Sequence, residues 1–299
     1  MNTFKKLYIA MGLMTGLFCA SCEPLEDTNW TRNSLVSLDW SQADAETGQR
    51  PAYLDTLQID YFSQLDDRDN VSYLFESNYG EFNVRSGQFD VMVSHDSPYI
   101  KNRERIRTAR IVLPTELNPA GERVIQSYPD SVMYAGFLYN VPMDYDERMA
   151  IEVPMYRMTR KINFIVYVGD EQELLEPCSM DMSGMCYEMT MHNRECNEEA
   201  DGTQVFQLVK YGRFYNEDHC LTAYKGTVNC LGTVGRNILY FTYIDCHGNT
   251  RHCTYDVTPY FKVWTTEETT VTLRILNYAD EFDVIGWKVG GSEDIEIIF

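Results

Sequence analysis

The sequence predicts an all-β protein with two tandem antiparallel β-sandwich domains. Apolar and polar residues alternate with period 2 in about fourteen short segments, which is typical of strands with one buried face. Glycine and asparagine mark the turns between these segments, and long helical patterns are scarce. Tyrosine and phenylalanine, which favour strands, number 21 and 14. The chain of 299 residues is longer than one core usually supports, so two domains are expected.

The N-terminus has the features of a secretory signal. Lys5 and Lys6 form a short basic region, and residues 7–20 form an apolar run. A membrane-spanning helix needs about 20 apolar residues, so this run is too short to cross a bilayer. Residues 1–21 are therefore predicted to be a signal peptide that is removed from the mature protein.

Cys22 follows the small residues Ala20 and Ser21 and is predicted to carry a lipid. The arrangement resembles a bacterial lipobox, in which a peptidase cuts before a diacylated cysteine. Two acyl chains, such as palmitate, are enough for stable anchoring. The position three residues before Cys22 holds Cys19, where the pattern usually has an aliphatic residue. The alternative is an ordinary signal peptide followed by an unmodified Cys22.

Acidic residues follow Cys22 in the stretch Glu23-Pro24-Leu25-Glu26-Asp27. This stretch resembles the tether that brings lipoproteins of the Bacteroidetes to the cell surface. The predicted location is therefore the outer membrane, with the lipid-anchored protein at the cell surface. A solvated acidic linker is the alternative. In either case residues 22–33 show no periodicity and are predicted to form a tether.

The strong negative charge limits the partners. The formal net charge is −20, and removal of residues 1–21 with their two lysines makes it −22. A chain this acidic repels nucleic acids and anionic lipid headgroups. We expect no nucleic-acid partner, and we expect membrane contact through the lipid on Cys22.

Residues 34–156 are predicted to form the N-terminal β-sandwich. Strands are expected at 34–40, 53–62 and 71–75, and a hairpin is expected to pair 80–84 with 88–93.

Two charged segments of this domain invite a functional interpretation. The acidic segment 65–70 lacks the spacing of an EF-hand loop, so a solvated turn is predicted rather than a calcium site. A basic cluster is predicted to be solvated or paired internally, with an acidic partner as the alternative. Its members are Lys101, Arg103, Arg105, Arg107 and Arg110.

Residues 157–299 are predicted to form a C-terminal, cysteine-rich β-sandwich. The last strand of the first domain is expected to stop at Pro154, and the alternation over 162–168 predicts the strand that opens the second domain. A two-residue turn at Gly248-Asn249 is expected to place Cys246 opposite Arg251. Residues 294–299 are predicted to be a final strand, so no C-terminal sorting domain is expected.

Seven cysteines remain after Cys19 and Cys22, and all lie in the second domain. Because seven is odd, at least one is free or pairs between chains. Cys246 and Cys253 are candidates for a disulfide, diagonally across the predicted hairpin. Buried thiols are the alternative. Four of the five histidines lie near a cysteine, but adjacent residues of a strand point to opposite faces, so no metal site is predicted.

The sequence contains none of the GxSxG, HExxH, P-loop or GxGxxG motifs. Its carboxylates are too numerous for spacing to identify the facing pair that a glycosidase needs. We therefore predict that the protein is not an enzyme and has no cofactor.

Several short segments resemble a known family. They are Ser37-Leu38-Asp39-Trp40, Gly80 to Val84 with Gly87 to Val91, Arg157 to Phe164, Tyr255-Asp256-Val257-Thr258 and Gly286-Trp287-Lys288-Val289. Together with Cys22 they make the chain similar to the fimbrillin-like lipoproteins of Bacteroidales, some of which are catalogued as domains of unknown function. The resemblance implies two transthyretin-like β-sandwiches. The cysteine-rich second domain and the imperfect lipobox depart from the family pattern.

The resemblance implies a fimbrial subunit, anchor or accessory protein that works in adhesion or assembly. Fimbrial subunits polymerise by adding a strand at a sheet edge, so other subunits are the expected partners. The alternative is a glycan-binding surface lipoprotein in which Trp30, Trp264 or Trp287 stacks on sugar rings. A hydrolase on a β-sandwich is a third hypothesis, which requires convergent carboxylates or a histidine-based site in a pocket.

Overall fold

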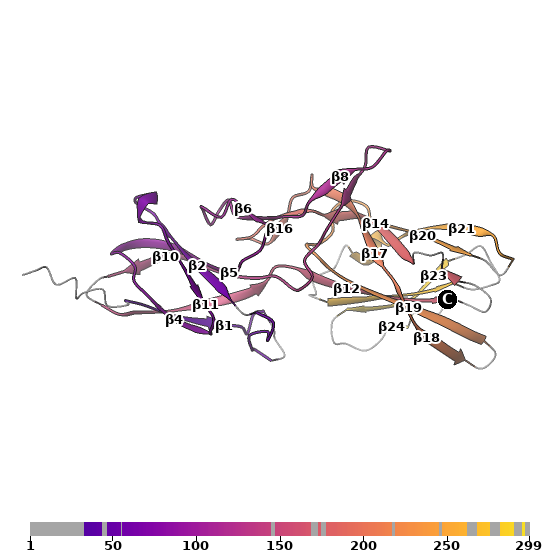
Figure 1. Cartoon of the computed structure of the whole chain (residues 1–299), viewed down its shortest axis with the longest axis horizontal. Helices are drawn as coiled ribbons and strands as arrows, with labels where there is room; N and C mark the ends of the chain where they lie inside the picture. Colours follow the sequence, from indigo (N-terminus) through magenta and orange to yellow (C-terminus); the bar gives the residue numbers. More distant parts are fainter. Residues whose placement is uncertain are drawn as a thin grey trace, which may run out of the picture.

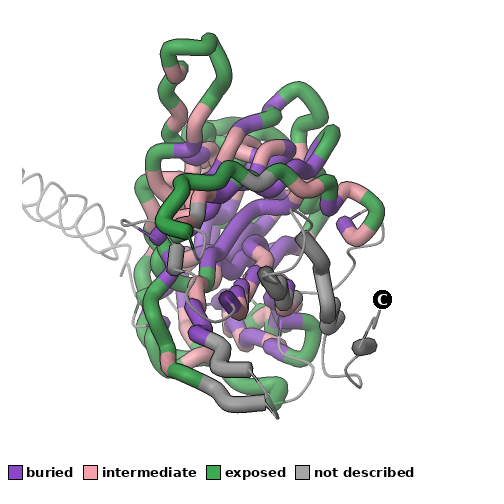
Figure 2. The backbone as a smooth tube through the Cα atoms, turned by 90° about the vertical axis from the view of Figure 1, so that its right-hand side faces the viewer, coloured by how far each residue is buried: buried purple, intermediate pink, exposed green. Residues whose placement is uncertain are grey.

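The computed structural model confirms the all-β prediction. It describes residues 33–43, 47–54, 56–144, 147–168, 173–174, 178–216, 219–244, 247–261, 268–275, 282–289 and 295–296. Helix within these ranges is limited to the single turns η2 (Asp67–Asp69) and α2 (Thr258–Phe261). Figure 1 shows the two halves of the chain lying end to end, and Figure 2 shows buried strands inside a shell of exposed loops.

The first half of the chain forms a seven-stranded set in the order β3-β2-β5-β10-β11-β1-β4. Its strands are β1 (Ser34–Asp39), β2 (Leu57–Ser63), β3 (Val71–Phe75), β4 (Tyr79–Phe82), β5 (Gly87–His95), β10 (Tyr134–Met143) and β11 (Met149–Arg157). Strand β1 buries every second residue, as its alternating sequence predicts.

The second half contains a six-stranded sheet in the order β18-β19-β12-β22-β23-β24. Its strands are β18 (Val209–Asn216), β19 (His219–Cys230), β12 (Arg160–Val168), β22 (Glu268–Ile275), β23 (Phe282–Val289) and β24 (Ile295–Glu296). A seven-stranded sheet has the order β13-β20-β14-β17-β9-β8, with β21 also paired to β20. Its strands are β13 (Glu173–Leu174), β20 (Ile238–Ile244), β14 (Ser179–Cys186), β17 (Asp201–Gln207), β9 (Arg123–Ile125), β8 (Thr115–Leu117) and β21 (Thr250–Asp256).

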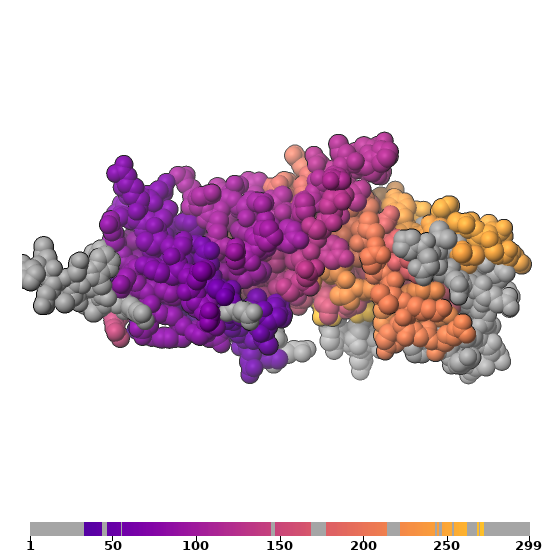
Figure 3. Space-filling view, viewed as in Figure 1, coloured from indigo at the N-terminus to yellow at the C-terminus, as the bar shows by residue number. Residues whose placement is uncertain are grey.

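A small four-stranded sheet has the order β16-β15-β7-β6. Its strands are β16 (Glu195–Cys196), β15 (Glu188–Thr190), β7 (Arg110–Val112) and β6 (Ile100–Lys101). Strand β7 pairs with β15, and β9 pairs in parallel with β17, so residues 100–125 complete sheets whose other strands follow residue 156. In the space-filling view this magenta part of the chain continues from the first half onto the second (Figure 3).

The hydrophobic core also crosses between the two halves of the sequence. Ile106, Ile111 and Leu113 are buried in the same cluster as Phe164 and Phe206. The aromatic rings of Phe164 and Phe206 are 4.6 Å apart between centroids. A second cluster belongs to the first half and contains Trp40, Tyr61 and Phe89, among other buried residues.

Strand β11 connects two layers of the first half. Residues 149–154 pair in parallel with β1, whereas residues 155–157 pair antiparallel with β10. The prediction that this strand stops at Pro154 is therefore wrong. Proline lacks an N–H donor, and it lies here at the point where the strand changes its partner.

The parallel pairing of an early and a late strand occurs in both halves. Strand β1 is parallel to β11, and β12 is parallel to β22, while most other pairs are antiparallel. In each half an early strand therefore lies directly beside a strand that comes much later in the sequence. The residues between them must leave the sheet and return to it.

Two predicted hairpins differ in the structure. Strand β4 pairs with β1, and β5 pairs with β2 and β10, so 80–84 and 88–93 do not pair with one another. The backbone N–H and C=O of Val84 instead bond to the side chain of Asn33 at 2.9 and 2.8 Å. The buried amide of Asn33 thus replaces a ladder partner where the chain crosses between layers.

The hairpin of β20 and β21 exists, but its register differs from the prediction. Ile244 pairs with Thr250, and Tyr243 pairs with Arg251, so residues 245–249 form a longer connection. Gly248 has a φ of +79° within this connection. Cys246 is therefore not opposite Arg251, and the two-residue turn at 248–249 is wrong.

We expect Gly136→Ala to lower the free energy of unfolding by about 1–3 kcal/mol, because it overpacks the point where β10 meets β11. A Cβ atom at Gly136 would lie 2.6 Å from Cγ1 of Val153 and 2.7 Å from the carbonyl oxygen of Pro154. Urea unfolding measures the change. Glu116→Ala, at an exposed strand position, is the control and should stay within about 0.5 kcal/mol. Equal stability of the Gly136→Ala variant and the wild type would contradict the close approach.

Candidate functional site

Large exposed apolar side chains gather on strands at the ends of the sheets. Leu74 lies on β3, Tyr79 on β4 and Leu117 on β8, while Val209 and Tyr211 lie on β18. Edge strands present unpaired backbone groups, and apolar side chains beside them favour the addition of a further strand. The arrangement is therefore typical of a protein-binding surface rather than of a catalytic site.

Strand β18 carries the most exposed pair of these side chains. Val209 is 69% exposed and Tyr211 is 61% exposed. The register with β19 shifts between Lys210 and Gly212, so a β-bulge lies at Tyr211. The ammonium group of Lys225 lies 3.4 Å from the centroid of the Tyr211 ring. This cation–π contact holds the ring on the strand surface.

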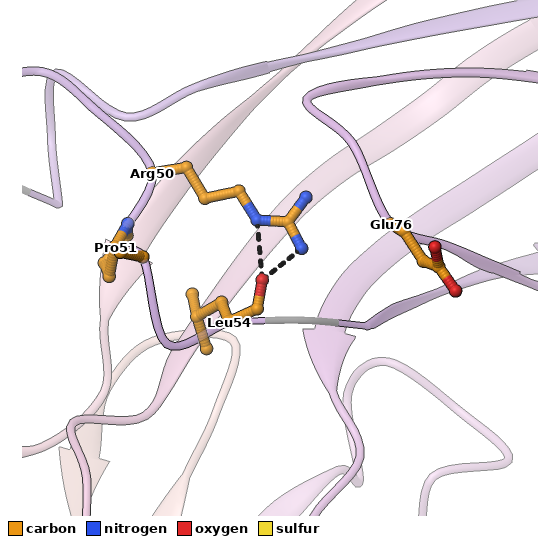
Figure 4. Close-up of a pocket in the computed structure, with 5 residues that line it drawn as sticks. Arg50, Pro51, Leu54 and Glu76 are labelled. Atoms are coloured by element: carbon orange, nitrogen blue, oxygen red, sulfur yellow. Dashed lines mark hydrogen bonds between the residues drawn. The ribbon is translucent and has the colours of Figure 1, made fainter.

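An open pocket lies in the first half of the chain. It has a volume of about 510 Å³ and is lined by Arg50, Pro51, Ala52, Leu54 and Glu76. Figure 4 shows the guanidinium of Arg50 on one side and the carboxylate of Glu76 on the other. Nε and Nη2 of Arg50 both donate to the carbonyl oxygen of Leu54, at 3.0 and 2.5 Å.

The loop geometry explains how Arg50 reaches this position. Leu54 N–H donates to the carbonyl of Pro51, which forms a tight turn. The Leu54 side chain is buried in the first core, so the turn and its arginine are fixed to the sandwich. The lining residues offer one cation, one carboxylate and small apolar groups, with neither a nucleophile nor a carboxylate pair for hydrolysis. The pocket therefore offers polar contacts without the groups that hydrolysis needs.

Most of the basic cluster pairs within the protein, as predicted. Arg105 pairs with Asp67 at 3.0 Å, Arg110 pairs with Glu188, and Nζ of Lys101 donates to a backbone carbonyl. Within the acidic segment 65–70, Asp67 is the partner of Arg105, and Asp69 pairs with Arg85 outside the cluster. The segment forms the turn η2, in which the Asp66 carboxylate accepts from the N–H of Arg68.

Arg103 makes the most buried of the cluster's ion pairs. Its Nε donates to the Asp60 carboxylate at 2.8 Å, and the Asp60 side chain is only 4% exposed. Gln58 and Ser72 also donate to Asp60, each at 2.6 Å. Arg103 therefore fastens the start of the segment that crosses to the second half onto strand β2.

The predicted site residues lie mostly outside the described structure. Cys22, Cys246, Trp30 and Trp264 are outside the described ranges, and Cys253 and Trp287 are described in their backbone alone. Trp40 is buried, and its indole N–H donates to Asn78 at 3.0 Å, so it belongs to the core. Sequence patterns did not indicate the pocket, because its two sides come from separate loops.

In the described part of the chain, no group of three or more histidine, cysteine, aspartate or glutamate residues is arranged to hold a metal ion. The described helices include none that is long and apolar enough to span a bilayer. The described cysteines Cys178, Cys186, Cys196 and Cys230 are thiols rather than halves of a disulfide.

Replacement of Arg103 should destabilise the protein far more than replacement of Arg105. Arg103→Met leaves a buried carboxylate without its cation, which costs about 3 kcal/mol or more. Arg105→Met removes an ion pair whose side chains are 69% and 66% exposed, so we expect a change below about 0.5 kcal/mol. Thermal and urea unfolding compare the two variants. Similar losses in the free energy of unfolding of both variants would show that burial of the Arg103–Asp60 pair does not determine its contribution to stability.

Comparison with known proteins identifies the fold. No protein-family model matches the sequence, and no curated protein matches it significantly. The chain is similar in structure to a candidate adhesin from Bacteroides ovatus, with a TM-score of 0.57 and 12% identity over 84% of this chain and 94% of that one.

Two proteins of Bacteroides thetaiotaomicron are equally similar in structure. One is a candidate adhesin, with a TM-score of 0.57 and 9% identity, over 89% of this chain and 98% of that one. The other is a candidate polysaccharide-binding protein, with a TM-score of 0.57 and 10% identity over the same shares. At these identities the likeness shows a common fold that spans both halves of the chain.

Proposed function

We propose that the protein is a non-enzymatic cell-surface lipoprotein that works in adhesion or in the assembly of fimbriae. The observation that carries the proposal is the set of exposed apolar side chains on edge strands, above all Val209 and Tyr211 on β18. The fold shared with two candidate adhesins supports it. The partner would be another surface subunit that adds a strand to an open edge.

Self-association of the unlipidated mature chain, residues 22–299, tests the proposal. We expect dimers or polymers in size-exclusion chromatography with light scattering. Deletion of residues 294–299 distinguishes exchange of the last strand between subunits from association through another sheet edge. It does so because β24 pairs with β23 of its own chain. A folded monomer after deletion means that the last strand is exchanged between subunits.

Edge strand β18 requires its own variant. Replacement of both Val209 and Tyr211 by lysine places two charges on this edge, and we expect it to reduce association at least tenfold. A control with Leu65→Lys changes an exposed apolar residue that lies outside the strands. Monomers in every variant, with the wild type monomeric too and unable to bind cells, would contradict an adhesive or assembly role.

Lipid attachment at Cys22 is a separate part of the proposal. We expect Cys22→Ser to abolish labelling with a palmitate analogue and to move the protein from the membrane fraction to the soluble fraction. Cys19→Ser is the matched control, because Cys19 leaves with the signal peptide and should not affect labelling of the mature chain. Retention of the label in the Cys22→Ser variant would contradict lipidation at this cysteine.

Glycan binding is a second candidate function, favoured by the open pocket of Arg50 and Glu76. The fold shared with a candidate polysaccharide-binding protein supports it. Binding to a glycan array should weaken at least tenfold in the Glu76→Gln variant, which removes the carboxylate charge of the pocket lining. Glu116→Gln is a control at an exposed site on strand β8. Equal binding by both variants would place any glycan site elsewhere.

A further inference from the structure

Three cysteines of the second half meet beside one glycine. Cys186 ends strand β14, Cys196 lies on β16, and Cys230 ends β19. The N–H of Cys186 donates to the carbonyl of Gly232 at 3.0 Å. A Cβ atom at Gly232 would lie 3.0 Å from Sγ of Cys196, so the glycine leaves the space that this thiol occupies.

The backbone N–H of Asn197, the residue after Cys196, donates to the carbonyl oxygen of Glu188 at 2.9 Å. Sγ of Cys186 also donates to the carbonyl oxygen of Glu188 at 2.9 Å, and Sγ of Cys196 lies 3.8 Å from the carbonyl oxygen of Leu231. The shared carbonyl of Glu188 and the shared neighbour Gly232 bring the two cysteines together, as an S–S bond of about 2.05 Å requires.

The two thiols differ in access and in charge. Cys196 is part-exposed, whereas Cys186 and Cys230 are fully buried. The hydrogen bond from Cys186 and the positive charge of Arg160 lower the pKa of Cys196, although burial opposes them. Its role as hydrogen-bond donor to Cys196 and its burial raise the pKa of the Cys186 thiol. Burial raises the pKa of Cys230 to about 12.

We propose that Cys196 and Cys186 form a redox-active dithiol, in which Cys196 attacks a disulfide-bearing oxidant and Cys186 resolves the mixed disulfide. In the first step the Cys196 thiolate forms an S–S bond with one sulfur of the oxidant, and the other sulfur leaves as a thiolate that takes up a proton. In the second step Cys186 loses its proton and attacks Sγ of Cys196, which expels the second thiol. The two cysteines are oxidised by two electrons, and the oxidant is reduced to two thiols.

The bond would close a loop that contains strand β15. Residues 187–195 lie between the two cysteines. Strand β15 pairs with β7, which belongs to residues 100–125, the segment that crosses from the first half to the second. Glu188 on β15 also forms an ion pair with Arg110 on β7. Oxidation would therefore fix the strand that receives the crossing segment, and it would stabilise the chain by limiting the unfolded state.

The test treats the full mature chain with excess oxidised glutathione or with dithiothreitol, followed by alkylation and peptide mapping. Trypsin cuts after Arg194, so the expected disulfide joins the peptide 162–194 to the peptide 195–210. The first peptide also contains Cys178, so Cys178→Ser is the matched control and should leave the cross-link unchanged. We expect oxidation to remove the thiols of both Cys186 and Cys196 and to raise the Tm by about 5 °C or more.

Single variants assign the roles of the two cysteines. Cys186→Ser should accumulate the mixed disulfide of Cys196 with glutathione, because the resolving thiol is absent. In the Cys196→Ser variant, Cys186 should remain an unmodified thiol under the same conditions. Near-ultraviolet circular dichroism of the reduced proteins checks that each variant is folded.

Three results would overturn the proposal. One is a chain that keeps both thiols after prolonged exposure to the oxidant while remaining folded. Another is a cross-link from Cys196 to the peptide 226–236, which contains Cys230 instead of Cys186. The third is a Cys186→Ser variant in which Cys196 forms no mixed disulfide with glutathione.

Discussion

The parallel pairing of β1 with β11 is the constraint on which the first half depends. Six consecutive residues of β1, from Ser34 to Asp39, pair with Met149 to Pro154. Parallel neighbours cannot be joined by a tight turn, so the chain between them must travel around the sandwich and return. Beyond Pro154 the same strand pairs with β10, and this change of partner joins the two layers. The amide of Asn33 and the missing side chain of Gly136 allow this close arrangement.

The crossing segment gives the molecule its second constraint. Residues 100–125 leave the first half, add β7 and β9 to sheets of the second half, and return to β10. Arg103 holds the start of this segment on the first half, and buried residues such as Ile111 hold its middle in the other core. Residues 100–125 therefore belong to the first half by sequence position but contribute strands to sheets of the second half.

Alternation in the sequence predicted the existence of strands more accurately than their partners. The period-2 patterns of 57–61 and 162–168 appear as β2 and β12, with alternate residues buried in β12. Periodicity tells which face of a strand is apolar, but it does not tell which strand lies beside it. For this reason the expected hairpin of 80–84 with 88–93 is absent, and the pairing of β9 with β17 was not foreseen.

The candidate site was less predictable than the fold. Which side chains remain exposed at an edge depends on the strand order, so Val209 and Tyr211 had no distinguishing pattern in the sequence. The meeting of Cys186 and Cys196 depends on Gly232, which lies 36 residues beyond the latter and belongs to another strand connection. Spacing therefore favoured Cys246 and Cys253, because short separations are the ones that a sequence reveals.

The direction of β1 has a mechanical consequence. A chain held at its N-terminus and pulled from its second half is loaded at the start of β1 and at the end of β11. Because these strands are parallel, the two forces act in opposite directions along neighbouring strands, and the hydrogen bonds between them bear the load together. Shear of this kind resists rupture better than peeling, in which bonds break one after another. The first sandwich therefore resists a force applied between the start of β1 and the end of β11 through all of these hydrogen bonds at once.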